Sequence, residues 1–234
     1  YKNMVQYMQI QDSSKKSNYD LYLMGQIATR LQDKDAAAVT YIKDAYTADT
    51  SRKNRTIYAA SLIKYYAHKG DKFNENLWKE HFIKNEGVSK SELYKLGVSW
   101  YKLNNFERAD SILKEFVKLY PNEPKGIYML AGVNARIDNN FKRGLAVPYY
   151  ENFINKVNGK KAEDYKNMLA ESYNYLGAYY YHRNDYQKSF ENYNQLLQYR
   201  PNDKTVRKAV KDLQKYLNEV EKFNASKKES KQDL

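Results

Sequence analysis

The sequence predicts an all-α protein built from repeated helix–turn–helix units that stack into a solenoid. Residues 170–203 carry apolar and small side chains at spacings of three and four, in two successive runs separated by a turn. Similar patterns begin at residues 56, 90 and 124, so the period is 34 residues. With four prolines and nine glycines in 234 residues, the chain has little material for a turn-rich β fold.

The clearest unit runs from residue 170 to residue 203. With Ala170 as position 1, the first helix carries its stripe at positions 4, 7, 8 and 11, which are Tyr173, Leu176, Gly177 and Tyr180. The second helix carries its stripe at positions 17, 20, 24 and 27, which are Tyr186, Ser189, Tyr193 and Leu196. Pro201 at position 32 ends that helix. The pattern resembles the tetratricopeptide repeat (TPR) at every position except 27, where alanine is usual. The resemblance implies a right-handed α-solenoid and leaves the partner open.

The same register divides most of the chain into five predicted TPR units, at residues 18–50, 56–89, 90–123, 124–160 and 162–202. The unit at 56–89 is the least regular, with Glu75 and Lys79 where an alanine and an aromatic residue are usual. Residues 1–16 carry Met4, Val5 and Met8 at helical spacing. We interpret them as the second helix of a truncated preceding repeat, because a repeat helix without its mate leaves an apolar face uncovered. The alternative is a separate N-terminal cap.

A capping helix is predicted at residues 203–223. Its apolar residues alternate spacings of four and three, and its other face is polar, as the end of a solenoid requires. Those residues are Val206, Val210, Leu213, Leu217 and Val220. Residues 224–234 have almost nothing apolar to bury, so we expect a disordered tail.

Residues 90–220 also resemble the C-terminal part of multi-TPR cell-envelope proteins of anaerobic Gram-negative bacteria. The resemblance rests on the phrase GLAVPYYENFI, with Pro148 near a helix start, and on the tyrosine-rich final repeat. It implies an exported, non-enzymatic protein located in the periplasm or cell envelope. A cytoplasmic location is the alternative.

Motifs for chemistry are missing from the sequence. The chain has no cysteine, and its histidines, His68, His81 and His182, are not paired at the i, i+4 spacing that places two zinc ligands on one helix face. Gly159 and Lys160 lack the upstream glycine of a phosphate loop. No apolar run approaches the ~20 residues of a membrane span. We therefore predict no enzyme activity, no metal site and no cofactor.

The sequence does predict an interaction surface. Positions 2, 5, 9, 12 and 13 of each first helix lie opposite the packing stripe, and in TPR proteins this face lines the concave groove. Position 5 carries Tyr22, Ala60, Tyr94, Tyr128 and Asn174. Position 13 carries Arg30, His68, Lys102, Arg136 and His182, and Tyr101 and Tyr181 occupy position 12. All of these except Ala60 are candidate peptide-binding residues.

These two rows have simpler explanations as well. Basic residues favour the last turn of a helix, where they offset its dipole. The chain also holds 25 tyrosines, most of them at packing positions. Because tyrosine is enriched at interfaces, our leading hypothesis is a scaffold that binds an extended, acidic or C-terminal peptide of a partner protein.

Two other functions remain open. The net charge of +12 is compatible with binding to nucleic acid or an anionic surface. However, the chain has 31 lysines and nine arginines, and dispersed lysine more often serves solubility, so nucleic acid is the less favoured partner. The third possibility is a structural spacer with no groove ligand. The sequence predicts no oligomeric state.

Overall fold

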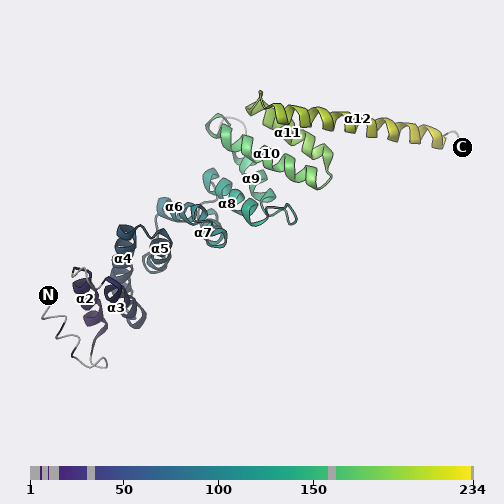
Figure 1. The fold of residues 1–234 in the computed structure, drawn as a ribbon. Helices are drawn as coiled ribbons and strands as arrows, with labels where there is room; N and C mark the ends of the chain where they lie inside the picture. Colours follow the sequence, from purple (N-terminus) through teal and green to yellow (C-terminus); the bar gives the residue numbers. More distant parts are fainter. Residues whose placement is uncertain (1–5, 7–9, 11–15, 31–34, 158–161, 233–234) are drawn as a thin grey trace. The chain divides into compact units, whose positions relative to one another are not determined.

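The computed structural model describes residues 6, 10, 16–30, 35–157 and 162–232. These residues form eleven α-helices, one short 3-10 helix and no strand (Figure 1). The predicted all-α repeat fold is confirmed. The chain divides into two compact units, Tyr1–Asn105 and Phe106–Leu234, which we call the N-terminal and C-terminal units.

The N-terminal unit consists of helical hairpins. Its helices are α2 (Asn18–Arg30), α3 (Asp35–Ala48), α4 (Arg52–Lys69), α5 (Lys72–Glu86) and α6 (Lys90–Lys102). Helix α2 packs on α3, and α4 packs on α5. The buried core joins the two hairpins through Ile42, Ala45, Tyr46, Tyr58, Ala59, Leu62, Tyr66 and Trp78.

The ends of these helices follow from local sequence signals. Helix α4 begins after Ser51, whose side chain accepts a hydrogen bond from the Asn54 N–H, and it ends at Gly70 with φ +71°. Asp71 then caps α5 by accepting from the Asn74 N–H. Helix α6 begins with a reciprocal capping box between Ser89 and Glu92. Each hairpin is therefore set by side chains within a few residues of its turn.

The C-terminal unit contains two further helical hairpins, one additional helix at each end, and a 3-10 turn. Its elements are α7 (Phe106–Leu119), α8 (Pro124–Ile137), α9 (Val147–Val157), η2 (Glu163–Tyr165), α10 (Lys166–His182), α11 (Tyr186–Tyr199) and α12 (Lys204–Gln232). Its core is centred on five residues that are each at most 2% exposed: Ile127, Phe153, Leu169, Leu176 and Leu196.

The glycines at position 8 of two repeats let helices of a hairpin approach closely. A Cβ atom on Gly25 would lie 2.5 Å from Cγ1 of Ile42, and one on Gly177 would lie 2.6 Å from the Tyr193 ring. Side chains do not tolerate such distances, so the packing requires glycine at both sites. The predicted register is thus reproduced at this position in both units.

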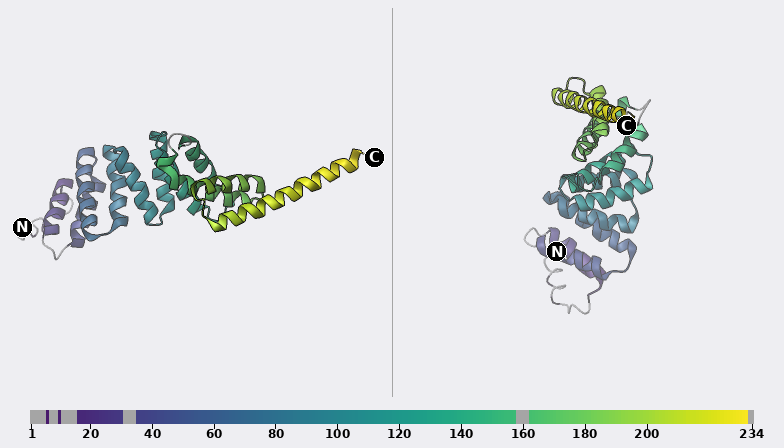
Figure 2. Two further views of the ribbon diagram at one scale, coloured as in Figure 1. Left: turned by 90° about the horizontal axis from the view of Figure 1, so that it is seen from above. Right: turned by 90° about the vertical axis from the view of Figure 1, so that its right-hand side faces the viewer.

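Helix α12 differs from the sequence prediction. We expected a capping helix at 203–223 and a disordered tail from 224, whereas the helix continues to Gln232. The added segment, residues 224–232, contains no proline or glycine. It holds three lysines, one glutamate, one glutamine and one alanine, which are residue types of high helix propensity. Val206 and Leu213 are buried, whereas Tyr216, Val220 and Phe223 are exposed. Figure 2 shows the end of α12 extending past α10 and α11.

Other sequence predictions fall on parts that the structure does not describe. The proposed truncated repeat at 1–16 lies outside the described residues, apart from Gln6, Ile10 and Lys16. In the described part of the chain, no helix has the length and hydrophobicity of a membrane-spanning segment.

Candidate functional site

A groove of about 700 Å³ lies along the first helices of the first two repeats. We call it the α2–α4 groove, after the two helices that supply most of its lining. Its lining residues are Tyr22, Gln26, Thr29, Ile42, Ser61, Lys64, Tyr65, His68 and Lys69.

Contacts between the repeats fix the walls of this groove. The Tyr22 ring lies 4.9 Å from the Tyr58 ring, centroid to centroid. One turn further along, the Gln26 side-chain amide donates a hydrogen bond of 3.1 Å to the Ser61 hydroxyl. Thus α2 and α4 are held by an aromatic contact and a polar contact on the face that forms the groove.

A buried aspartate anchors Tyr58 beneath the groove. Asp49 accepts hydrogen bonds from the Ser51 N–H, the Asn54 amide and the Tyr58 hydroxyl, at 2.8, 2.8 and 2.9 Å. Burial alone would raise the pKa of Asp49, but these donors lower it below its usual value. Burial and the bond to Asp49 together raise the pKa of Tyr58. The tyrosine hydroxyl therefore stays protonated and the contact stays intact at neutral pH.

The groove is basic. Lys64, His68 and Lys69 are exposed residues of its lining, and the lining contains no aspartate or glutamate. The Lys69 ammonium lies 5.8 Å from the centre of the Tyr65 ring, so it also approaches an aromatic wall of the groove. No cluster of three metal-ligating side chains occurs among the described residues. The arrangement suits the recognition of carboxylates or another anionic group.

In the N-terminal unit, two of the predicted site residues line this groove. They are Tyr22 and His68. The side chain of Arg30 lies outside the described residues. On α6, Tyr94 and Tyr101 are half-buried and Lys102 is exposed, and burial raises the pKa of Tyr94.

In the C-terminal unit, three predicted site residues contact other side chains of the same unit. The Tyr128 hydroxyl donates to Glu171, and its ring lies 5.3 Å from Phe153. The Arg136 guanidinium lies 5.4 Å from the centre of the Phe106 ring. Tyr128 is therefore half-buried in contacts inside the unit, whereas Arg136 stays exposed beside the Phe106 ring.

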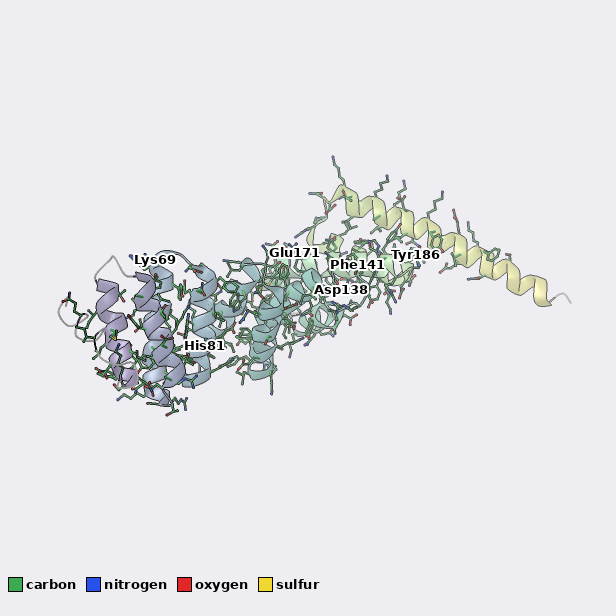
Figure 3. The ribbon with its side chains drawn as sticks, turned by 60° about the horizontal axis from the view of Figure 1, so that its bottom comes forward. Lys69, His81, Asp138, Phe141, Glu171 and Tyr186 are labelled. Atoms are coloured by element: carbon green, nitrogen blue, oxygen red, sulfur yellow. The ribbon has the colours of Figure 1, made fainter. Side chains whose placement is uncertain are left out.

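The third of these residues, His182, is exposed and contacts a loop. Its ring stacks on Phe141 with 5.0 Å between centroids. Phe141 lies on the connection between α8 and α9, near Asp138 (Figure 3). Asn174 is exposed, and Tyr181 lines a separate cleft of about 490 Å³ beside α12.

Asp138 shapes the loop that carries Phe141. Its carboxylate is 3% exposed and accepts backbone N–H bonds from Arg143, Gly144 and Leu145, the shortest at 2.7 Å. Burial alone would raise the pKa of Asp138, but these backbone donors and the Arg143 charge lower it. Burial and the charge of Asp138 raise the pKa of Tyr175, which packs against Phe141, to about 12. The loop is therefore a fixed part of this unit.

The sequence interpretation missed seven residues of the α2–α4 groove. Three of them are Thr29, Ile42 and Ser61, and the other four are Gln26, Lys64, Tyr65 and Lys69. Gln26 and Lys64 stand at position 9, a position that the helix geometry placed on the open face. Tyr65 and Lys69 stand at positions 10 and 14, and no periodic signal distinguishes them from packing or solvent positions. The first two could have been found from spacing, whereas the last two required the structure.

Successive helical hairpins with an open groove along their first helices define the α-solenoid class of repeat proteins. Tetratricopeptide repeat models match residues 93–123 and residues 170–203. The chain therefore carries tetratricopeptide repeats, which confirms the family predicted from the sequence. Repeats of this family indicate a scaffold for protein–protein interaction, and the fold is typically non-catalytic.

Solved structures agree with this assignment of the fold. The chain is similar to the C-terminal part of a TPR repeat-containing protein from Cytophaga hutchinsonii, at 26% identity and a TM-score of 0.57, covering 89% of this chain and 79% of that one. It is also similar in fold to a MamA protein, at 20% identity and a TM-score of 0.52, covering 76% of this chain and 94% of that one. No curated protein sequence matches the chain.

Proposed function

We propose that the α2–α4 groove binds an extended, acidic segment of a partner protein. The observation that carries the proposal is the charge of the lining, in which Lys64, His68 and Lys69 come together without a carboxylate. A partner segment with spaced acidic side chains would be complementary to this lining.

The other lining residues suit a peptide backbone. Tyr22 and Tyr65 supply flat apolar area with a hydrogen-bonding tip, the residue type most often enriched at interfaces. The Gln26 side-chain amide already donates to the Ser61 hydroxyl, but it retains its carbonyl oxygen and a second N–H, which can bind backbone N–H and C=O groups. In this proposal the tyrosines contribute contact area and the cations select acidic side chains.

Binding of nucleic acid is the second candidate. Every described helix from α4 to α12 carries at least one exposed lysine. Lysines so widely distributed favour solubility over a dedicated phosphate-binding face. The acidic-peptide proposal is therefore preferred, and a structural spacer without a groove ligand is the remaining alternative.

The test uses a fluorescein-labelled peptide of alternating glutamate and alanine, blocked at both ends, and measures fluorescence anisotropy. A Lys64→Gln/Lys69→Gln variant should bind the peptide about fivefold or more weakly at low salt, since each exposed charge pair contributes ~0.2 to 1 kcal/mol. The loss should shrink as salt increases, because exposed pairs are screened. Tyr22→Ala should weaken binding at every salt concentration.

The matched control is Lys211→Gln/Lys222→Gln, which removes the same charge from exposed positions on α12. The control should leave the affinity for the peptide within about twofold of the wild type, since these lysines lie outside the groove. Equal losses in the two double variants would argue for a diffuse anionic partner. Tighter binding of a single-stranded oligonucleotide of the same charge, with equal losses in both variants, would favour nucleic acid.

A further inference from the structure

A second cavity, of about 390 Å³, lies among α4, α5 and α6. We call it the Ala60 pocket. Its wall is mainly apolar, formed by Ala60, Ile63, Phe82, Ile83, Val88 and Leu96. Ile63 and Phe82 pack at the same time against the core of the N-terminal unit, so the wall of the pocket is supported from behind.

The pocket occupies the place where another repeat carries a tyrosine ring. Ala60 stands at position 5, and the equivalent residue Tyr128 lays its ring against Phe153 of its own second helix. Phe82, on the second helix of the Ala60 repeat, lines the pocket in the corresponding way. The alanine thus leaves open a space that the tyrosine fills in the C-terminal unit.

Lys64 lines both the Ala60 pocket and the α2–α4 groove. A peptide that pairs an acidic side chain with Lys64 can therefore insert a neighbouring side chain into the pocket. Three other charged residues line the pocket: Lys79, Glu92 and Lys95. Lys79 pairs with Glu75 at 2.6 Å, and Glu92 accepts from the Ser89 hydroxyl at 2.6 Å. They hold the rim in place without entering the apolar interior.

We infer that the Ala60 pocket binds one large apolar side chain of the acidic segment. The preferred ligand then carries leucine or phenylalanine next to its acidic residues. This inference rests on the proposed function, because the acidic residues bring the segment into the groove. The pocket supplies sequence selectivity that the charges alone do not provide.

The test places alanine, leucine or phenylalanine at the centre of the end-blocked glutamate–alanine peptide. The leucine and phenylalanine peptides should bind the wild-type chain about tenfold more tightly than the alanine peptide, the ratio expected for partial burial of such a side chain. Ala60→Tyr should abolish this preference by filling the pocket.

The matched control is Ala225→Tyr, the same substitution at an exposed site on α12, which should keep the preference. Circular dichroism melting checks that both tyrosine variants fold, and the three peptides test the wild-type chain without any variant. Salt-sensitive binding with equal affinity for the three peptides would overturn the pocket and leave the groove proposal standing. Failure of all three peptides to bind would overturn both.

Discussion

Position 5 of the repeat is open at Ala60 in the N-terminal unit and filled at Tyr128 in the C-terminal unit. At the junction of α4 with α6, Ala60 leaves an apolar pocket. At the junction of α8 with α10, Tyr128 packs on Phe153 and donates a hydrogen bond to Glu171. The helical hairpins supply an equivalent site in both units, and a single side chain decides whether it becomes a pocket or a contact between repeats.

The histidines at position 13 differ in their contacts, although both are exposed. In the N-terminal unit, His68 is exposed and lines a groove with two lysines. In the C-terminal unit, His182 stands at the same repeat position and stacks on Phe141. The loop that carries Phe141 is an insertion in the α8–α9 turn, and it places an aromatic ring against one face of His182.

The largest expected effect comes from a position that is the same in both units. Leu96 and Leu176 stand at position 7 and are 3% and 2% exposed. Replacing either with alanine should lower the free energy of unfolding by ~2 to 5 kcal/mol, because each leaves a cavity in a packed core. Urea unfolding followed by circular dichroism measures the loss.

Leu119→Ala is the control for the leucine series, since Leu119 is 54% exposed on α7. It should cost less than ~0.5 kcal/mol. If either core variant behaved like this control, the assignment of position 7 to the core would be wrong in that unit.

The next largest loss of stability is expected at Tyr128, which packs on Phe153 and bonds to Glu171. Tyr128→Ala should destabilise the C-terminal unit by ~2 kcal/mol, because it removes a half-buried ring from Phe153 together with the hydroxyl donor to Glu171. Tyr128→Phe keeps the ring and should cost less than ~1 kcal/mol. Thermal melts of both variants separate the two contributions. Equal losses in the two variants would show that the hydroxyl, and not the ring, closes the junction.

The next prediction concerns Asp138, which accepts the backbone N–H bonds of the loop that carries Phe141. Asp138→Asn should cost ~1 to 2 kcal/mol at neutral pH, because the amide accepts the three backbone N–H groups less well than the carboxylate does. The pKa of Asp138 is lowered by folding, so its contribution is present above the ordinary aspartate pKa and is lost as pH falls through the lowered value.

The pH dependence gives a measurable signature for Asp138. The stability difference between wild type and Asp138→Asn should be full at neutral pH and should shrink below about pH 4. Urea midpoints measured across this range provide the comparison, with Asp164→Asn at an exposed site as the control. A difference that grew on acidification would contradict the assigned direction of the pKa shift.

The sequence predicted the parts of the fold that depend on spacing alone. Leu96 and Leu176 at position 7, and the glycines at position 8, follow from helical periodicity. The bond from Tyr128 to Glu171 joins two repeats, and the stack of Phe141 on His182 depends on the path of an irregular loop, so neither is encoded in a local pattern. Helix α12 was predicted too short because a polar helical segment carries no apolar periodicity.

The candidate site was predictable only in part for a related reason. Positions 5 and 13, which lie opposite the packing stripe of each first helix, led to Tyr22 and His68, and both line the α2–α4 groove. At these positions in the C-terminal unit, Tyr128, Arg136 and His182 contact aromatic side chains, whereas Asn174 is exposed. A periodic pattern does not distinguish these uses. Ala60 gave no signal as a binding residue, because a pocket arises there from what the side chain lacks.

The smallest expected effect on stability comes from closing the open junction. Ala60→Tyr places a ring beside Ile63, Phe82 and Leu96, in a cavity that already exists, so little has to move. The ring buries apolar area but loses rotamer freedom, and we expect the free energy of unfolding to change by less than ~1 kcal/mol. Ala60→Tyr and Tyr128→Ala are therefore not mirror images: filling a pocket is nearly neutral, whereas emptying a packed site costs stability. Urea unfolding of both variants tests this asymmetry, and a loss above ~2 kcal/mol in Ala60→Tyr, typical of overpacking, would show that the two repeats do not share this space.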